Sequence, residues 1–177
     1  LTTSAAMGIL LFNDQILVTT SAALGELETV NVQLPDRSVN TANLVHIFPH
    51  NGIAVLQIEQ QFDQATFLRT LAKTSGIKYS QAFASGQVVT VLLENPQRLV
   101  VDQTSGQAMI TLRSSDSNKM DIWAYTEGAP VVDQSGRLIG LCTHIGAALG
   151  FIPIQSIEKQ IRALSDGDDI FSLSPAP

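Results

Sequence analysis

Short apolar segments of strand length recur along this chain of 177 residues, separated by polar residues that favour turns. Most are rich in β-branched side chains, which pack well on a pleated sheet. Residues 30–34 alternate apolar and polar side chains, as expected for a strand with one face in solvent. Such a series predicts an all-β sandwich or barrel, with strands over residues 7–12, 16–20, 30–34, 44–48, 53–58, 88–93, 98–102, 108–113, 122–125, 131–133, 138–144 and 150–154.

One helix is expected near the end of the chain. Its apolar residues recur at steps of three and four, so their side chains share one helical face: Ile154, Ile157, Ile161 and Leu164. Pro153 suits the start of a helix, where its missing N–H costs nothing. The sequence therefore predicts a β domain that ends in one amphipathic helix.

Charge and cysteine content exclude several classes of protein. A net charge of -6 and a chain without a Lys/Arg cluster argue against a nucleic-acid partner. The single cysteine, Cys142, rules out an internal disulfide framework. No apolar run approaches the roughly 18 residues needed to span a bilayer, so we expect no membrane insertion. Because the chain begins at Leu1, we interpret it as an excised domain or processed product, and we make no prediction of its cellular compartment.

Segments spread over most of residues 8–164 resemble, in the same order, trypsin-like serine proteases of the HtrA/Deg branch. They read GILLFNDQILVT (8–19), VNVQL (30–34), PHNGIAVLQIE (49–59), GAPVVDQSGRLIGLCT (128–143) and LGFIPI (149–154). The resemblance implies two antiparallel β-barrels of the trypsin/chymotrypsin type packed across a cleft, with a C-terminal helix. The chain 1–177 is then one domain with an N-terminal barrel, a connection, a C-terminal barrel, a helix and a flexible tail, over residues 5–60, 61–83, 84–153, 154–164 and 165–177.

The resemblance places the family's three catalytic positions on residues that cannot carry its chemistry. Peptide hydrolysis on this scaffold needs a serine, a histidine that takes its proton and an aspartate that orients the histidine. The histidine position falls on Ala22, or on Ser21 if the register slips by one, and the aspartate position on Gly52. The serine position falls on Glu127, and Tyr125 stands where the oxyanion pocket uses a glycine. The resemblance thus implies a pseudoprotease.

Glu127 is a poor substitute for the serine. Its carboxylate would repel the developing oxyanion by roughly 4 kcal/mol at about 4 Å and an effective dielectric near 20, on the order of a thousandfold in rate. We expect the carboxylate to occupy the former oxyanion pocket or to pair with a nearby cation, and a Glu127 that points freely into solvent would contradict this.

The remaining polar residues favour structural interpretations. Cys142 lies in an apolar strand and is expected to be a buried thiol. A dyad of Cys142 with His144 is disfavoured because residues two apart on a strand are about 6–7 Å apart. His46 and His50 have a spacing that binds zinc only on a helix, and Pro49 argues against a helix there. We therefore expect neither a metal nor a cofactor.

The predicted function is non-catalytic binding of a protein or peptide, for scaffolding or for regulation of a larger assembly. Thr143, His144 and Ile145 match the family strand that pairs with substrate backbone, so they are either a peptide-docking edge or an ordinary strand end. Two alternatives remain: a purely structural module, and a peptidase that uses relocated residues such as His46, His144 or Cys142. An imidazole, an acid and a hydroxyl or thiol meeting in an accessible groove would contradict the loss of catalysis. The oligomeric state is not predicted.

Overall fold

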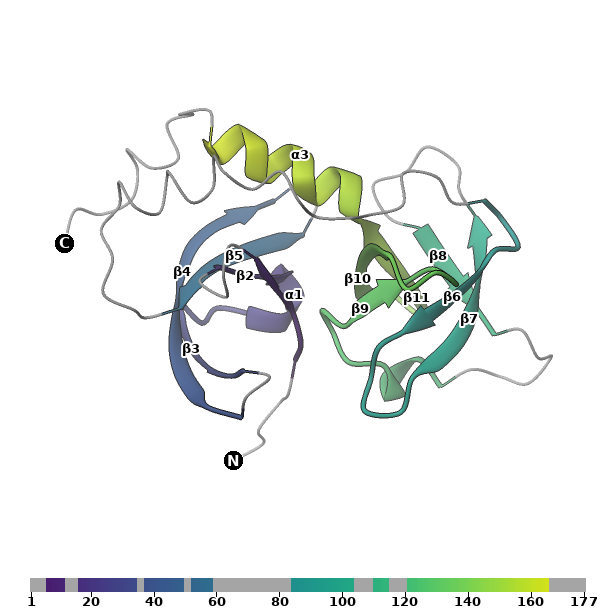
Figure 1. The fold of residues 1–177 in the computed structure, drawn as a ribbon, viewed down its shortest axis with the longest axis horizontal. Coiled ribbons are helices and arrows are strands. Elements are labelled where there is room, and N and C mark those ends of the chain that lie inside the picture. Colours follow the sequence, from purple (N-terminus) through teal and green to yellow (C-terminus); the bar gives the residue numbers. More distant parts are fainter. Residues whose placement is uncertain are drawn as a thin grey trace.

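A computed structural model describes residues 6–11, 16–34, 37–49, 52–58, 84–103, 110–114 and 121–165 (Figure 1). The connection expected over 61–83 lies outside the described residues, as does the tail expected over 165–177 beyond its first residue. None of the described helices is both long enough and apolar enough to cross a membrane.

The first half of the chain forms a curved, antiparallel five-stranded sheet with the strand order β1-β2-β5-β4-β3. A single helical turn, α1 (Ser21–Leu24), follows β2. The register of β4 against β5 shifts between Leu44 and His46, which marks a bulge. The strands are β1 (Ile9–Leu11), β2 (Ile16–Thr20), β3 (Thr29–Gln33), β4 (Val39–Phe48) and β5 (Ile53–Ile58).

Burial along these strands follows their sequences. Strand β2, which lies between β1 and β5, is buried at every position, and the central strand β5 is buried at all but one. Edge strand β3 instead alternates between exposed polar residues and half-buried valines. The alternation in its sequence therefore reports its position at the border of the sheet.

The second half forms a closed antiparallel barrel of six strands with the order β10-β11-β8-β7-β6-β9. A 3-10 helix, η1 (Ile122–Ala124), precedes β9, so the strand expected over 122–125 is wrong. The barrel strands are β6 (Val88–Val91), β7 (Gln97–Gln103), β8 (Ile110–Arg113), β9 (Pro130–Val132), β10 (Leu138–Ile145) and β11 (Ala148–Pro153).

A shared apolar core joins the two halves. The final helix, α3 (Ile154–Ser165), lies across both of them (Figure 1). Its buried isoleucines, 154, 157 and 161, pack in one cluster with side chains from β2, β4, β5, β10 and β11. Separate clusters fill the interior of each half. The predicted fold class, an all-β protein with two antiparallel barrels of the trypsin type and a C-terminal helix, is confirmed. The first barrel is a curved sheet whose outer strands β1 and β3 are not paired with each other.

Candidate functional site

The loop that carries Glu127 is fastened to strand β10 by backbone hydrogen bonds. The Gly128 N–H donates to the Cys142 carbonyl at 2.8 Å, and the Cys142 N–H donates to the Ala129 carbonyl at 2.7 Å. Gly128 has a φ of 81°, a left-handed conformation that glycine adopts without strain. The loop therefore has a fixed position at the start of β9.

The segment before β1 ties the first half of the molecule to this loop. The Met7 N–H donates to the Glu127 carbonyl at 2.9 Å, and the Thr19 hydroxyl donates to the Met7 carbonyl at 2.6 Å. A Cβ atom added to Gly128 would lie 2.0 Å from the Met7 carbonyl oxygen, so the two segments are in close contact. The structure thus places Glu127 against the first half.

The two other positions assigned by the resemblance lie close to one another in the first half. The Ser21 N–H at the start of α1 donates to the Gly52 carbonyl at 2.7 Å, and Thr20 pairs with Ile53. Ala22 is exposed on α1, and Gly52 is half-buried with a φ of 65°. Neither residue has a side chain that can accept or donate a proton.

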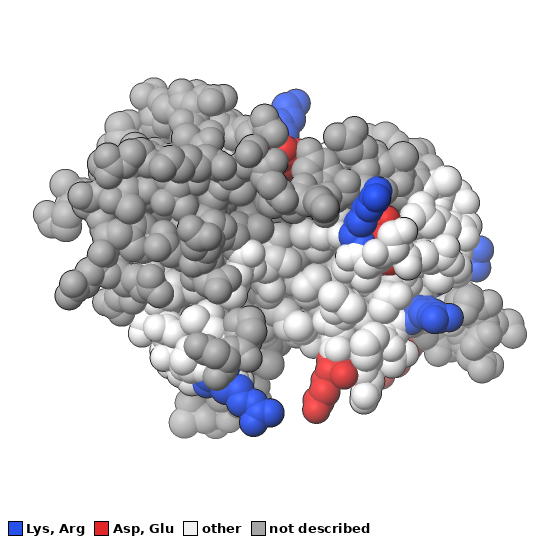
Figure 2. All heavy atoms as spheres, in the orientation of Figure 1, with Lys and Arg blue, Asp and Glu red and all other residues white. Residues whose placement is uncertain are grey.

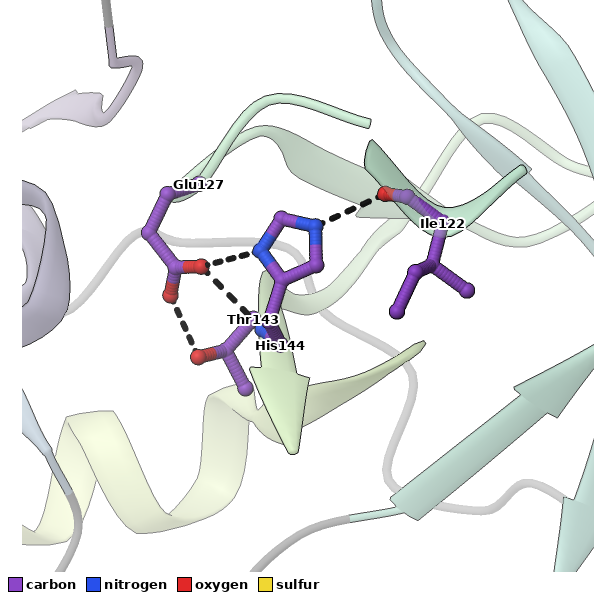
Figure 3. Close-up of polar contacts among 4 residues, drawn as sticks. All are labelled: Ile122, Glu127, Thr143 and His144. Carbon is purple, nitrogen blue, oxygen red and sulfur yellow. Dashed lines mark hydrogen bonds and ion pairs between the residues drawn. The ribbon is translucent and has the colours of Figure 1, made fainter. Parts of the chain in front are cut away.

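The Glu127 side chain is held by its neighbours on β10 and does not point freely into solvent (Figure 3). Its Oε1 accepts a hydrogen bond from the Thr143 hydroxyl, and its Oε2 accepts one from the His144 backbone N–H at 3.1 Å. The same Oε2 lies 2.8 Å from His144 Nδ1. The side chains of Glu127 and His144 are only 13% and 17% exposed, so water screens the contact weakly.

The hydrogen-bond partners of His144 indicate where the protons of the Glu127–His144 pair lie. Its Nε2 lies 2.7 Å from the Ile122 carbonyl, which can only accept, so Nε2 carries a hydrogen. A bare Nδ1 facing the Glu127 carboxylate would set lone pair against lone pair. A proton therefore lies between Nδ1 and Oε2, as an imidazolium beside a carboxylate or an imidazole beside a carboxylic acid.

An imidazole, an acid and a hydroxyl thus do meet at hydrogen-bonding distance, but in an order that differs from a protease triad. In a triad the imidazole lies between the hydroxyl and the acid and takes the hydroxyl proton. Here the Glu127 carboxylate lies between Thr143 and His144, and both ring nitrogens of His144 already have partners. Thr143 is also buried. The arrangement offers no imidazole nitrogen to the Thr143 hydroxyl.

The resemblance assigns Tyr125 to the position of the oxyanion glycine, and its backbone N–H already has a partner. The N–H donates to the Ile122 carbonyl at 3.2 Å within the turn of η1. The side chain is buried in the second barrel, and this burial, followed by the electrostatic effect of the neighbouring Cys142 thiol group, raises the pKa of the Tyr125 phenol.

The other candidate side chains lie apart from this network. Cys142 is fully buried, and burial, followed by the nearby charge of Glu127, raises the pKa of its thiol to about 12. Burial lowers the pKa of His46 on β4, and its ring packs edge-on against Phe48 with centroids 4.6 Å apart. His50 lies outside the described residues. Within the described ranges, no three His, Cys, Asp or Glu side chains are grouped to hold a metal ion.

The expected docking edge is the end of β10. This strand pairs with β11 through Ile145 but with β9 only as far as Leu141. Beyond Leu141, the edge of β10 that faces β9 forms backbone hydrogen bonds with the Glu127 loop at Cys142. Further along the same edge, the His144 N–H donates to the Glu127 carboxylate. Met7 and Ile122 join segments that are far apart in the chain through backbone groups, so residue types alone did not indicate their roles.

Comparison with known proteins relates this architecture to proteases. The sequence profile of a family described as "Trypsin-like peptidase domain" matches residues 6–141. The crystal structure of the serine endoprotease from Yersinia pestis is similar, with a TM-score of 0.67 and 15% sequence identity. The match covers 92% of this chain and 58% of that one, so the chain spans little more than half of that protein. At this identity the likeness concerns the fold alone. No curated protein sequence matches the chain significantly.

Proposed function

Because this chain belongs to the trypsin-like peptidase domain family, we propose that it is a member without peptidase activity whose cleft binds a protein or peptide. The observation that carries the proposal is the Glu127 carboxylate, held by Thr143 and His144 where the resemblance expects a nucleophile. Such a domain would scaffold or regulate a larger assembly.

The chemistry of the three assigned positions supports the absence of turnover. Acyl transfer requires a nucleophile whose proton passes to a base, and Ala22 and Gly52 supply neither a base nor an orienting acid. Glu127 would form a mixed anhydride with a peptide carbonyl, and the imidazole that contacts it, His144, already has a partner at each ring nitrogen and so does not offer a proton to the leaving amine. The Tyr125 N–H, bound to Ile122, is unavailable to a developing oxyanion.

The edge of β10 supports the binding role. At His144 the backbone N–H that faces the Glu127 loop is occupied by a side-chain oxygen and not by another strand. A peptide carbonyl that takes the place of this oxygen would add a strand alongside Thr143–Ile145. Glu127 on this view competes with the peptide for the edge of β10.

Two measurements test the proposal. A panel of fluorogenic peptides should show no turnover, and a fluorophosphonate or thiol-reactive probe should not label the folded chain, with an active trypsin-type protease as the positive control. Turnover that a single substitution abolishes would refute the loss of catalysis.

Binding is tested with immobilised peptide libraries and a matched pair of variants. His144→Pro removes the backbone N–H at the edge, whereas His144→Ala retains it. Peptides captured by the wild type should be lost in the first variant and retained in the second. Equal capture by both variants would place the peptides away from the edge of β10 and contradict this role, and no capture by the wild type would favour a purely structural module.

The meeting of Glu127, His144 and Thr143 favours one alternative, a peptidase that uses relocated residues. Of the candidates for that role, Cys142 is buried with a pKa raised to about 12, and His46 lies on β4. The alternative therefore depends on His144, and it requires the bond from Nε2 to Ile122 to open. Turnover in the wild type that His144→Ala abolishes and His46→Ala leaves unchanged would establish it.

A further inference from the structure

The Glu127 carboxylate lies on strand β10 as a bound ligand lies on its site. Its oxygens contact three donors: the Thr143 hydroxyl, the His144 backbone N–H and, through the proton that they share, His144 Nδ1. All three donors belong to two consecutive residues of β10, whereas the carboxylate comes from a loop 16 residues before Thr143. Strand β10 therefore supplies the site, and the loop supplies its occupant (Figure 3).

The donors have supports other than Glu127. The His144 ring is fixed by the contact of its Nε2 with the Ile122 carbonyl at 2.7 Å. Thr143 and His144 both pair with β11 in the antiparallel ladder, which fixes their backbones. A site whose donors are already oriented loses little conformational entropy when a ligand binds. The donors thus form a preorganised site that persists when the Glu127 side chain rotates away from β10.

The donor set matches a carboxylate better than a carbonyl group. One oxygen of Glu127 accepts from Thr143, and the other faces both the backbone N–H and the ring of His144. A carbonyl has a single oxygen, so it would leave the Thr143 hydroxyl, which is only 4% exposed, without this acceptor. Hydrogen bonds to an ionised acceptor are also roughly twice as strong as neutral ones. The site therefore favours a ligand with two charged oxygens.

This preference depends on local contacts and not on a charged surface. In the described part of the face shown in Figure 2, basic and acidic side chains stand singly and form no basic cluster. Single exposed charges are screened by salt within about 10 Å. On this face, recognition of a carboxylate therefore rests on the donors of Thr143 and His144.

The edge of β10 determines how a docked chain reaches these donors. Both backbone groups of Cys142 are bonded to the Glu127 loop, through Gly128 and Ala129. By the alternation of an antiparallel ladder, the backbone N–H and C=O of His144 face the same side as those of Cys142. A strand added antiparallel beside His144 therefore points its C-terminal end at the loop. Such a strand has no backbone partner beyond His144.

We propose that Thr143 and His144 bind the C-terminal carboxylate of a partner polypeptide, and that Glu127 fills this site until the partner displaces it. The inference rests on the proposed docking of a peptide beside β10 and names the group that the docked chain presents. An internal acidic residue would carry its main chain on past Cys142, where the loop already lies. A terminal carboxylate has no such continuation, and its two oxygens replace those of Glu127 one for one.

Glu127 sets the apparent affinity of the site. A site that is open in only a fraction of the molecules binds with a Kd that is raised by the inverse of that fraction. Glu127→Ala removes the occupant and leaves all three donors in place, so this variant should bind a carboxylate more tightly than the wild type. Glu127→Gln keeps a side chain of nearly the same size in the site and is the matched control.

The first test uses the 177-residue chain and a fluorescein-labelled peptide, Thr-Val-Thr-Val-Thr-Val, made as a free acid and as a C-terminal amide. In anisotropy titrations, the wild type should bind the acid about tenfold more tightly than the amide. Compared with the wild type, binding of the acid should tighten by about tenfold in Glu127→Ala and by less than about threefold in Glu127→Gln. His144→Ala keeps the backbone N–H but loses the ring, so it should bind both peptides with a preference below about threefold.

A second test does not depend on the sequence of a peptide. With a Kd of about 10 mM, about 100 mM sodium acetate should raise the Tm of Glu127→Ala by about 3–6 °C relative to sodium chloride. The wild type and Glu127→Gln should shift by less than about 1 °C, because their sites are filled.

The outcomes separate this proposal from the docking on which it rests. Equal binding of acid and amide by the wild type and by Glu127→Ala would overturn the carboxylate site, and docking beside β10 would still stand if His144→Pro lost both peptides. An amidated peptide with Asp next to its last residue that bound as tightly as the acid would assign the site to an internal acidic side chain and overturn the proposal. Stabilisation by acetate without binding of any peptide would overturn it too, since the site would then take only small carboxylates.

Discussion

Replacing His144 with alanine should destabilise the fold by an amount that the structure allows to be worked out. The substitution removes the contact of Nδ1 with Glu127 and the bond from Nε2 to the Ile122 carbonyl. It also leaves the Glu127 carboxylate, which is 13% exposed, with two donors where it had three.

A hydrogen bond to a charged group contributes about 1.5–3 kcal/mol, and a neutral one about 0.5–1.5 kcal/mol. Breaking a fully buried ion pair costs about 3–5 kcal/mol, and the residual exposure of this pair lowers that figure. We expect a loss of about 2–4 kcal/mol in the free energy of unfolding. For a chain of this length that is a fall of about 4–16 °C in Tm.

Urea denaturation followed by tryptophan fluorescence measures this loss, because the only tryptophan, Trp123, belongs to η1. A double-mutant cycle of His144→Ala with Glu127→Ala isolates the interaction of the two side chains. Its coupling free energy should be about 1–3 kcal/mol. As a matched control, His46→Ala on β4 should be additive with Glu127→Ala to within about 0.5 kcal/mol.

A coupling free energy below about 0.5 kcal/mol between His144 and Glu127 would refute the reasoning. It would mean that the two side chains do not share a proton in the folded protein, and the proposed competition between Glu127 and a docked peptide would lose its basis.

Three further predictions concern single positions. Gly128→Ala should lower the free energy of unfolding by about 2–4 kcal/mol, because its Cβ would meet the Met7 carbonyl. Gly136→Ala, with a similar φ of 77° and open space around it, should lower it by only about 1–2 kcal/mol. Equal losses for the two variants in chemical denaturation would contradict the close contact at Gly128. Cys142, with its pKa raised to about 12, should resist iodoacetamide at about pH 8 until urea unfolds the chain, as mass spectrometry would show. Burial lowers the pKa of His46 in the folded protein, so below about pH 6.5 the unfolded chain binds more protons than the folded chain does. The free energy of unfolding should therefore decrease as the pH falls through this range, and denaturation curves of His46→Leu should show a weaker dependence on pH.

The strands that could be predicted from sequence are those whose burial is uniform. Residues 16–20 and 53–58 are short apolar runs at the centre of a sheet, and both form strands over those ranges. Strand β4 begins at Val39, five residues before the expected strand. Residues 39–43 include polar side chains that are typical of a turn, and they form a strand because β3 and β5 pair with β4 on either side. Residues 122–125 are also a short apolar run, and periodicity does not distinguish such a run from one turn of helix.

The candidate site was less accessible to sequence reasoning. The resemblance could assign Ala22, Gly52 and Glu127, and it led to the expectation that the Glu127 carboxylate would occupy the former oxyanion pocket or pair with a nearby cation. The identity of that partner depends on how the Glu127 loop lies against β10, 17 residues further along the chain at His144. Contacts of backbone groups such as the Ile122 carbonyl leave no trace in residue types, so their contribution emerged only from the folded structure.

The apolar cluster that joins the two halves draws its members from β2, β4, β5, β10, β11 and α3, and Ala22, Gly52 and Glu127 are not among them. The side chains that hold the two halves against each other are therefore apolar, and none of them lies at a position that the resemblance assigns to catalysis. Substitutions at those three positions therefore leave this cluster untouched, so an architecture of this kind can take on another function while it keeps its apolar core.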